Sequence, residues 1–301
     1  MSSLLEVLQN PSVALLVAGL LGLCVGSFLN VVIHRTPLMM NYAWRKEIAW
    51  YLDSQDDLDK THVQGITSVI ENDTPISLSF PPSRCPNCGH QIRFYENIPI
   101  ISWLFLRGAC SDCGNPISIR YPLVELITAI LSVLTIYVLG ANLAGAFGLI
   151  YLWVLIALTG IDFDTQLLPD RLVFPLGMLG LAVNSQGIFV SPTSALWGGL
   201  LGFLSLWSVA TLYALLTKKD GMGAGDFKLL GALGAWVGVS MLPLIILVSA
   251  LLGSVVGLVL MRLSGESKPF AFGPYIAIAG IIALLWGVDI MSWYTGLYQT
   301  S

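Results

Sequence analysis

Long apolar stretches separated by short polar segments dominate the hydrophobic pattern of this 301-residue chain. A helix that crosses a bilayer needs about 20 mostly apolar residues. Stretches of this kind predict eight transmembrane helices, at about 12–34, 121–140, 144–161, 172–190, 194–216, 227–240, 241–261 and 272–290. The sixth and seventh are separated only weakly, at Ser240–Pro243. The pattern therefore predicts an all-α polytopic membrane protein.

A single polar insert, residues 35–120, interrupts the apolar pattern after the first predicted helix. It holds eight of the 14 basic and nine of the 18 acidic residues of the chain. We therefore expect three parts: a first transmembrane helix (1–34), a small insert (35–120) and a seven-helix core (121–301).

The composition agrees with a membrane protein and excludes other classes. Only 11% of the residues are charged and 55% are hydrophobic, with a mean hydropathy of +0.79. A soluble domain carries roughly a quarter charged residues, so an ordinary soluble enzyme is excluded. Disorder is excluded as well, because a disordered chain is polar and poor in apolar residues. We expect the bilayer to be a partner and nucleic acid not to be one.

The few basic residues predict the orientation. No Lys or Arg precedes the first apolar stretch, and Arg35 follows it, which is unlike a cleavable signal peptide. By the positive-inside rule, residue 35 is then cytoplasmic. Counting eight helices onward places 35–120, 162–171, 217–226 and 262–271 in the cytoplasm and both termini outside. The segments predicted outside contain no Lys or Arg.

Glycines recur at a spacing of four within three predicted helices, at Gly22/Gly26, Gly198/Gly202 and Gly253/Gly257. Small residues at this spacing let transmembrane helices approach closely. We therefore expect these pairs to lie at helix contacts and to have no catalytic role.

Four cysteines in the insert form two CxxC pairs, Cys85/Cys88 and Cys110/Cys113. Each pair supplies two thiolates from one turn, and a glycine follows each pair where a tight turn favours one. This spacing predicts a closed, structural zinc site of the ribbon type. Two disulfides are the alternative, which the cytoplasmic placement disfavours. His90 is either a substitute ligand or a surface residue.

Two aspartates lie where apolar helices meet polar loops, Asp162 after the third predicted helix and Asp226 after the fifth. Ionisable residues beside a membrane segment indicate function. Two carboxylates delivered by different helices can share a proton and hydrolyse a peptide bond. Gly223 and Gly225 before Asp226 remove side-chain bulk, so a substrate strand could lie against this loop.

Structural alternatives stay open for these carboxylates. Asp162 and Asp226 could cap helix ends or pair with Arg171 and Lys228. Asp170 follows a proline at the start of a predicted helix, which favours an N-cap. The glycines at 221, 223 and 225 also resemble a dinucleotide loop, but they follow a transmembrane stretch rather than a strand, so we reject that interpretation.

A transporter or channel that uses Asp162 and Asp226 as ion-coupling groups is the rival hypothesis. Transporter sites are typically marked by paired Gly/Pro interruptions near the middle of the membrane. The predicted helices lack them, and both aspartates are predicted near the membrane edge.

Taken together, the motifs resemble the type IV prepilin peptidases over essentially the whole chain. They are Gly26–Arg35, the two CxxC pairs, Glu96–Pro99, Arg120–Glu125, Asp162–Asp170, Gly223–Asp226 and Phe272–Pro274. The resemblance implies a GxGD aspartic protease with Asp162 and Asp226 as its catalytic pair. It implies a bacterial inner-membrane enzyme that removes the basic leader of prepilins or pseudopilins at the cytoplasmic face.

The resemblance also implies a second reaction, methylation of the new N-terminal residue with S-adenosylmethionine. This activity is attributed to the insert. Glu96, Asn97 and Gly108 are the candidate contacts to the methyl donor, although Gly108 could instead simply turn the chain into the second cysteine pair. Glu125 lies in the second predicted helix and is interpreted either as a polar contact between helices or as a residue that helps to position the substrate.

Overall fold

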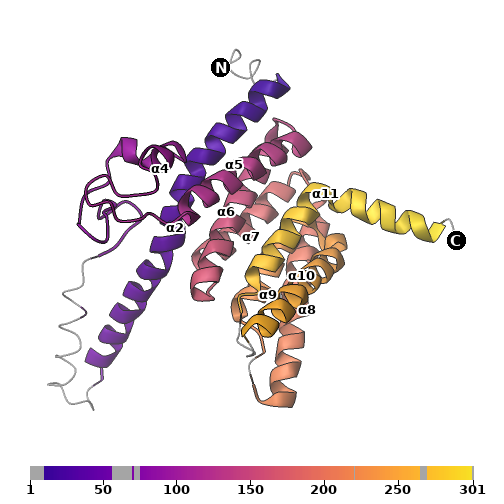
Figure 1. Ribbon diagram of the computed structural model, residues 1–301. Helices are drawn as coiled ribbons and strands as arrows, with labels where there is room; N and C mark the ends of the chain where they lie inside the picture. Colours follow the sequence, from indigo (N-terminus) through magenta and orange to yellow (C-terminus); the bar gives the residue numbers. More distant parts are fainter. Residues whose placement is uncertain (1–9, 56–69, 71–74, 220, 265–269, 300–301) are drawn as a thin grey trace.

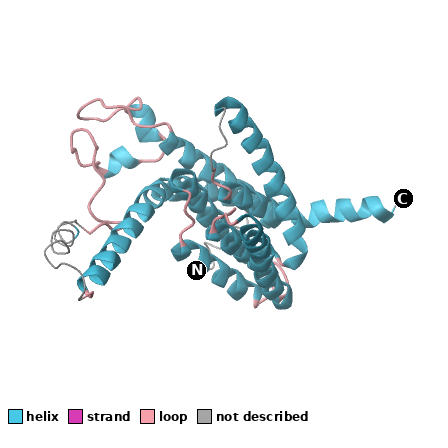
Figure 2. Cartoon of the chain, turned by 90° about the horizontal axis from the view of Figure 1, so that it is seen from below, coloured by secondary structure: helices cyan, strands magenta, loops and turns pink. Residues whose placement is uncertain are grey.

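The computed structural model describes residues 10–55, 70, 75–219, 221–264 and 270–299. Over these residues the chain is helical without a strand (Figure 2), and two isolated bridges lie in the insert. The helices are α2 (Pro11–Asp53), η1 (Phe94–Asn97), α4 (Ile101–Phe105), α5 (Arg120–Leu139), α6 (Leu143–Thr165), α7 (Asp170–Asn184), α8 (Pro192–Thr217), α9 (Ala224–Val237), η2 (Val239–Met241), α10 (Leu242–Ser264) and α11 (Gly273–Gln299).

Each predicted apolar stretch forms a helix, so the predicted all-α class is confirmed. Among the described residues, six helices are long and apolar enough to cross a membrane. The other two, α7 and α9, have only 15 and 14 residues. At 1.5 Å per residue each is about 20 Å long, which is short of the ~30 Å hydrocarbon core.

α2 is longer than the sequence predicts. The apolar pattern ends near residue 34, but the helix continues through Pro37 to Asp53. Arg35 ends the apolar pattern without ending the helix, because arginine is itself a good helix former. Its guanidinium donates to backbone carbonyls of the insert, at 2.9 Å to Ser77 and 2.7 Å to Pro81. The polar insert therefore begins on a helix that emerges from the first transmembrane segment.

α7 ends six residues earlier than the predicted stretch 172–190. Asn184 is fully buried at its end, and its amide nitrogen donates at 2.9 Å to the carbonyls of both Ala235 and Trp236 on α9. Its amide oxygen accepts from the backbone N–H of Phe189 at 3.0 Å. This side chain binds carbonyls at the C-terminal end of α9 and an N–H of the loop that follows α7, which fixes the turn where the helix stops.

The break between the sixth and seventh predicted helices lies earlier than Ser240–Pro243. α9 ends at Val237, and its C-cap Gly238 has a φ of +80° and donates its N–H to the carbonyl of Gly234. A glycine reaches this conformation without strain. η2 then leads into α10.

α9 lies at the centre of the main core, packed against α7, α8 and α11, and α6 and α10 contribute buried residues to the same cluster. Trp236 is fully buried there against the ring of Tyr151, with 4.9 Å between the centroids, and it donates from Nε1 to the carbonyl of Leu176 at 2.8 Å. The short α9 is therefore a buried scaffold that holds its own first turn, including Asp226, among three other helices.

The predicted glycine contacts are present. α2 and α5 lie side by side (Figure 1), and a Cβ at Gly22 or Gly26 would lie 2.7 Å from a backbone Cα of α5. On α8, Gly198 packs directly on the backbone of Gly234 of α9, and Gly253 of α10 packs on Phe272. The described part of the insert, with η1 and α4, lies beside α2 (Figure 1).

Candidate active site and metal centre

The two predicted aspartates lie close together and are buried. Asp162 lies in the last turn of α6 and is 4% exposed, and Asp226 lies in the first turn of α9 and is 8% exposed. Their carboxylates are near enough to interact electrostatically. Oδ2 of Asp162 also accepts a hydrogen bond from the backbone N–H of Gly273, at 3.0 Å. Three helix ends, from α6, α9 and α11, therefore converge at one site.

Glycines allow this close approach. A Cβ at Gly273 would lie 2.6 Å from Oδ2 of Asp162, and a Cβ at Gly225 would lie 2.7 Å from Cβ of Leu168. Both distances are shorter than real Cβ contacts. A Cβ at Gly223 would meet Asp226 at an ordinary 3.7 Å, so packing around this carboxylate does not require a glycine there.

Sequence reasoning assigned no role to Gly273. The motif Phe272–Pro274, which contains Gly273, is the sequence signal that points to this residue.

Asp170 binds Lys228 and does not cap a helix. Both of its carboxylate oxygens accept from Nζ of Lys228 at 2.9 Å. The N-cap of α7 is Pro169, and its first turn has no side-chain cap. The predicted N-cap role of Asp170 is therefore wrong, because a partner on α9 takes the carboxylate. The pair links the first turn of α7 to the first turn of α9, just after Asp226.

A second ion pair lies on the α6 side of the site. Nη1 of Arg120 donates to Oδ1 of Asp164 at 2.6 Å, and Nη2 donates to the carbonyl of Gly160 at 3.3 Å. Arg120 is the first residue of α5, directly after the insert. The last turn of α6, which carries Asp162, is thus tied to the point where the insert re-enters the helical bundle. The sequence pattern did not predict this pairing.

The four predicted metal ligands form one cluster. The Sγ atoms of Cys85, Cys88, Cys110 and Cys113 all lie within 4.8 Å of one another. Sγ of Cys85 is 3.8 Å from that of Cys113, and Sγ of Cys88 is 4.0 Å from that of Cys110. Tetrahedral zinc with Zn–S bonds of about 2.3 Å separates its sulfurs by about 3.8 Å. The donor set and its spacing therefore fit a zinc ion, and all five cysteines of the chain are free rather than disulfide-bonded.

The cluster is built from two knuckles with the same hydrogen bonds. The N–H of Cys85 donates to the carbonyl of His90, and that of Cys110 donates to the carbonyl of Asn115, both at 2.8 Å. In each knuckle a glycine with φ near +70° follows the second cysteine. Backbone N–H groups lower the pKa of the Cys85 thiol, and that of Asn115 contributes most to lowering the pKa of Cys113 to about 6. Both effects favour the thiolates that a metal requires.

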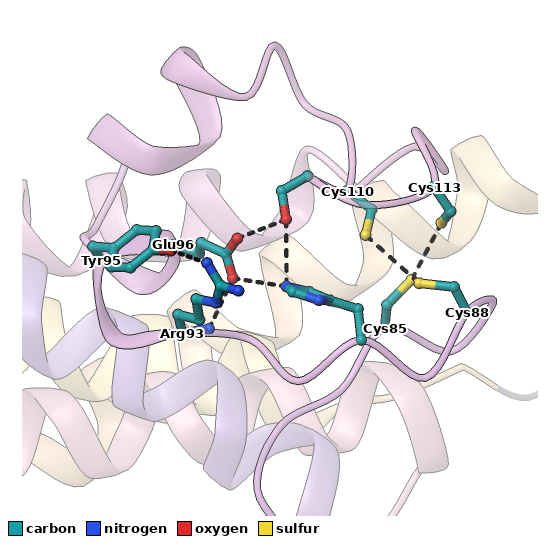
Figure 3. Close-up of polar contacts among 9 residues, drawn as sticks. Cys85, Cys88, Arg93, Tyr95, Glu96, Cys110 and Cys113 are labelled. Atoms are coloured by element: carbon teal, nitrogen blue, oxygen red, sulfur yellow. Dashed lines mark hydrogen bonds and ion pairs between the residues drawn. The ribbon is translucent and has the colours of Figure 1, made fainter.

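Glu96 connects the two knuckles (Figure 3). Its carboxylate accepts from the backbone N–H of Arg93 at 2.8 Å, from Oγ of Ser111 at 2.6 Å and from Nε2 of His90 at 3.1 Å. His90 follows the first pair of cysteines and Ser111 lies inside the second pair. The backbone N–H of Arg93, then Ser111 and His90, lower the pKa of Glu96 to about 2, so it is ionised at neutral pH. The contact with Glu96 accounts for His90 without metal ligation.

Gly108 has a conformational role that needs no cofactor. Its φ is +68°, and a Cβ would lie 2.8 Å from the ring of Trp103. It leads the chain from α4 into the second knuckle, which is the structural alternative that the sequence left open. Asn97, at the end of η1, is exposed. Contact of Glu96, Asn97 or Gly108 with a methyl donor stays a prediction.

Glu125 is buried between α2 and α5, and it binds the insert rather than the aspartates. Its Oε2 accepts from the backbone N–H of Ile100 at 2.7 Å. Of the two roles expected for Glu125, a polar contact is present: the donor is a backbone amide at the start of α4, and Ser27 of the neighbouring α2 also lies beside the carboxylate. A role in positioning the substrate stays a prediction.

Comparison with known proteins agrees with the two regions described above. The bacterial peptidase A24 N-terminal domain matches residues 20–139, and the type IV leader peptidase family matches residues 149–258. The chain is 48% identical over 288 residues to the prepilin leader peptidase/N-methyltransferase of Stutzerimonas stutzeri, covering 95% of each chain. It is 49% identical over 277 residues to the protein of that name from Aeromonas hydrophila, covering 91% of each.

A more distant relative of the same name, from Legionella pneumophila, is 38% identical over 295 residues, which is 97% of this chain and 98% of the relative. No solved structure matches the chain. The identities extend over nearly the full length of both partners, and the two matched domains contain the cysteine cluster and the aspartate pair respectively. The chain therefore belongs to the family of prepilin leader peptidase/N-methyltransferases.

Proposed function

We propose that this protein is a membrane aspartic endopeptidase that removes the leader from prepilins or pseudopilins and then methylates the new N-terminal residue. The observation that carries the peptidase part is the convergence of two buried carboxylates, Asp162 and Asp226, from different helices. Kinship with relatives named for both activities supports the pair of reactions. Those relatives give no support to the transporter hypothesis.

In the proposed mechanism Asp162 and Asp226 share one proton, because two close carboxylates do not both ionise readily. The ionised carboxylate takes a proton from water, whose oxygen attacks the scissile carbonyl carbon. The protonated carboxylate donates a hydrogen bond to the carbonyl oxygen. The C–N bond then breaks and the leaving amine takes up a proton. The pair acts as one titrating unit, so neither role is assigned to one residue.

In this mechanism Gly273 has a positioning role. Its N–H holds Oδ2 of Asp162 and thereby fixes the plane of that carboxylate. The ion pairs Asp170–Lys228 and Asp164–Arg120 brace the two helix ends that carry the aspartates.

The second reaction transfers a methyl group from S-adenosylmethionine to the new α-amine, with loss of a proton from the amine. We assign it to the insert, with Glu96, Asn97 and Gly108 as candidate contacts. The four cysteines would hold zinc, and a bound zinc ion would cross-link the two knuckles. A small insert with little apolar core gains its stability from such a cross-link.

We place the protein in the bacterial inner membrane, with the insert and the aspartates on the cytoplasmic side and both termini in the periplasm. The distribution of Lys and Arg supports this orientation. In this arrangement leader cleavage and methylation occur on the same side of the membrane, as the order of the two reactions requires.

The test is cleavage of a prepilin by the purified protein in proteoliposomes, read by mass spectrometry. Asp162→Asn and Asp226→Asn should each lower the cleavage rate by about 10³-fold or more, because an amide cannot act as a base. Asp289→Asn, on the far half of α11, is the matched control and should cleave at the wild-type rate. Wild-type cleavage by either of the first two variants would refute the catalytic pair.

A further inference from the structure

Glu125 occupies an unusual place for a carboxylate. It lies in the second turn of α5, faces α2 and is only 7% exposed. The absence of a side chain at Gly26 lets the two helix backbones meet there, since a Cβ would lie 2.7 Å from Cα of Glu125. Ser27 of α2 is also buried and lies beside the same carboxylate. Burying a carboxylate costs free energy unless a hydrogen-bond donor replaces the water that it loses.

The specific donor is a strained residue of the insert. Ile100 has a φ of +59°, a conformation that β-branched residues rarely adopt. Its N–H points at Oε2 of Glu125 with a donor–acceptor distance of 2.7 Å. Strained backbone of this kind persists only where the surroundings impose it, and it concentrates at functional sites. The contact with Glu125 is one of the bonds that hold it here.

Ile100 controls the orientation of the rest of the insert. It is the N-cap residue of α4 (Ile101–Phe105), and three residues later Trp103 packs over Gly108. Nε1 of Trp103 donates to the carbonyl of Ile117 at 3.2 Å. On the other side of Ile100, η1 carries Glu96, which binds both knuckles. This amide therefore links η1, α4 and the cysteine cluster to α2 and α5, in addition to the contacts of Arg35 with the start of the described insert.

We propose that Glu125 is a positioning residue for the methylation step: it locks the insert onto the helix pair α2–α5, so that the amine released at the aspartates reaches the methyl donor. This inference rests on the proposed function. The contacts that hold Asp162, from Gly273 and from the last turn of α6, do not involve Glu125. Loss of the lock therefore affects methylation more than cleavage.

The test compares Glu125→Ala with Glu125→Gln in the full-length protein in proteoliposomes, with a prepilin and S-adenosylmethionine. Mass spectrometry gives the methylated fraction of the cleaved product, which is the readout. Glu125→Ala should lower this fraction about tenfold, as expected for the loss of a hydrogen bond to a charged group. Glu125→Gln should restore it to near the wild-type value, because its amide oxygen still accepts from the N–H of Ile100.

Amide hydrogen exchange provides a second readout that does not depend on activity. The N–H of Ile100 and the amides of α4 should exchange faster in Glu125→Ala than in the wild type, with Glu125→Gln close to the wild type. Unchanged exchange, an unchanged methylated fraction in Glu125→Ala, or failure of Glu125→Gln to restore it would each overturn the proposal. A wild-type protein that neither cleaves nor methylates would refute the proposed function, while the exchange data would still decide whether Glu125 holds Ile100.

Discussion

Asp162 is held by a residue 111 positions further along the chain, Gly273, whose N–H binds its carboxylate. The same glycine leaves no space for a side chain between the start of α11 and Oδ2. The Asp162 carboxylate thus packs directly against the backbone at the start of α11. This tight contact makes Gly273 a sensitive position for testing the geometry of the aspartate pair.

We predict that Gly273→Ala lowers the rate of prepilin cleavage about tenfold or more, which corresponds to about 1.4 kcal/mol in the barrier. The added Cβ would lie 2.6 Å from Oδ2 of Asp162 and must displace the carboxylate or the helix. The cleavage rate in proteoliposomes is the measurement. Gly296→Ala, on the same helix, is the control, because its Cβ would meet no atom within 4 Å. Equal rates for the two variants would contradict the prediction.

Residues with strong chemistry were predictable, and their partners were not. The sequence marks Asp162, Asp226 and the paired cysteines, because their residue types and spacing are rare in an apolar chain. It misassigned Asp170 because the proline before it is a local signal for a helix start, whereas Lys228 reaches the carboxylate from a distant helix. Local patterns carry no information about such a tertiary contact.

At the scale of elements, the apolar pattern found the eight longest helices of the described residues but misjudged several ends, and it did not find the short η1, α4 and η2. α2 passes its predicted end by 19 residues, since hydropathy marks where the chain leaves the apolar layer and not where a helix ends. α7 stops early because Asn184 binds the backbone of α9. The end of α7 thus depends on a side chain that bonds across the fold, and hydropathy along the chain does not register such a contact.

The paired knuckles support a prediction about metal. Cys88→Ser should lower the zinc content of the purified protein and make the insert more sensitive to limited proteolysis. The reason is that the three remaining thiolates cannot complete a tetrahedral site. Metal analysis by mass spectrometry gives the zinc content. Cys24→Ser is the matched control, since Cys24 is exposed on α2 and lies outside the cluster. A wild-type protein with two disulfides and no metal would refute the zinc site.

The whole molecule joins two parts through one pair of helices. The aspartate site lies where α6, α9 and α11 meet, the cysteine cluster lies in the insert, and α2 and α5 connect them. α5 contacts both sides within its first two turns, through Arg120 to Asp164 and through Glu125 to Ile100. The division of the chain at 34 and 120 stays a prediction, although the long α2 shows that the first boundary is not a helix end.

Orientation in the membrane is testable at this scale. A membrane-impermeant maleimide applied to intact spheroplasts should label Ser191→Cys, which precedes α8, and should leave Lys219→Cys, which follows α8, unlabelled. The reason is that Lys218 and Lys219 mark the cytoplasmic end of that helix. Permeabilised cells should label both positions. The reverse pattern in intact spheroplasts would invert the proposed topology.

The repetition of one knuckle has a consequence for the order of events during synthesis. Cys85 and Cys88 emerge from the ribosome first and supply only two of the four ligands. The site is complete only after Cys110 and Cys113 have emerged. Both later cysteines precede Arg120, so the metal site can close before α5 has emerged. The insert can then be folded before α5 packs against it. If the site holds zinc as proposed, a cell short of zinc would make a protein whose second membrane helix emerges before the insert has folded.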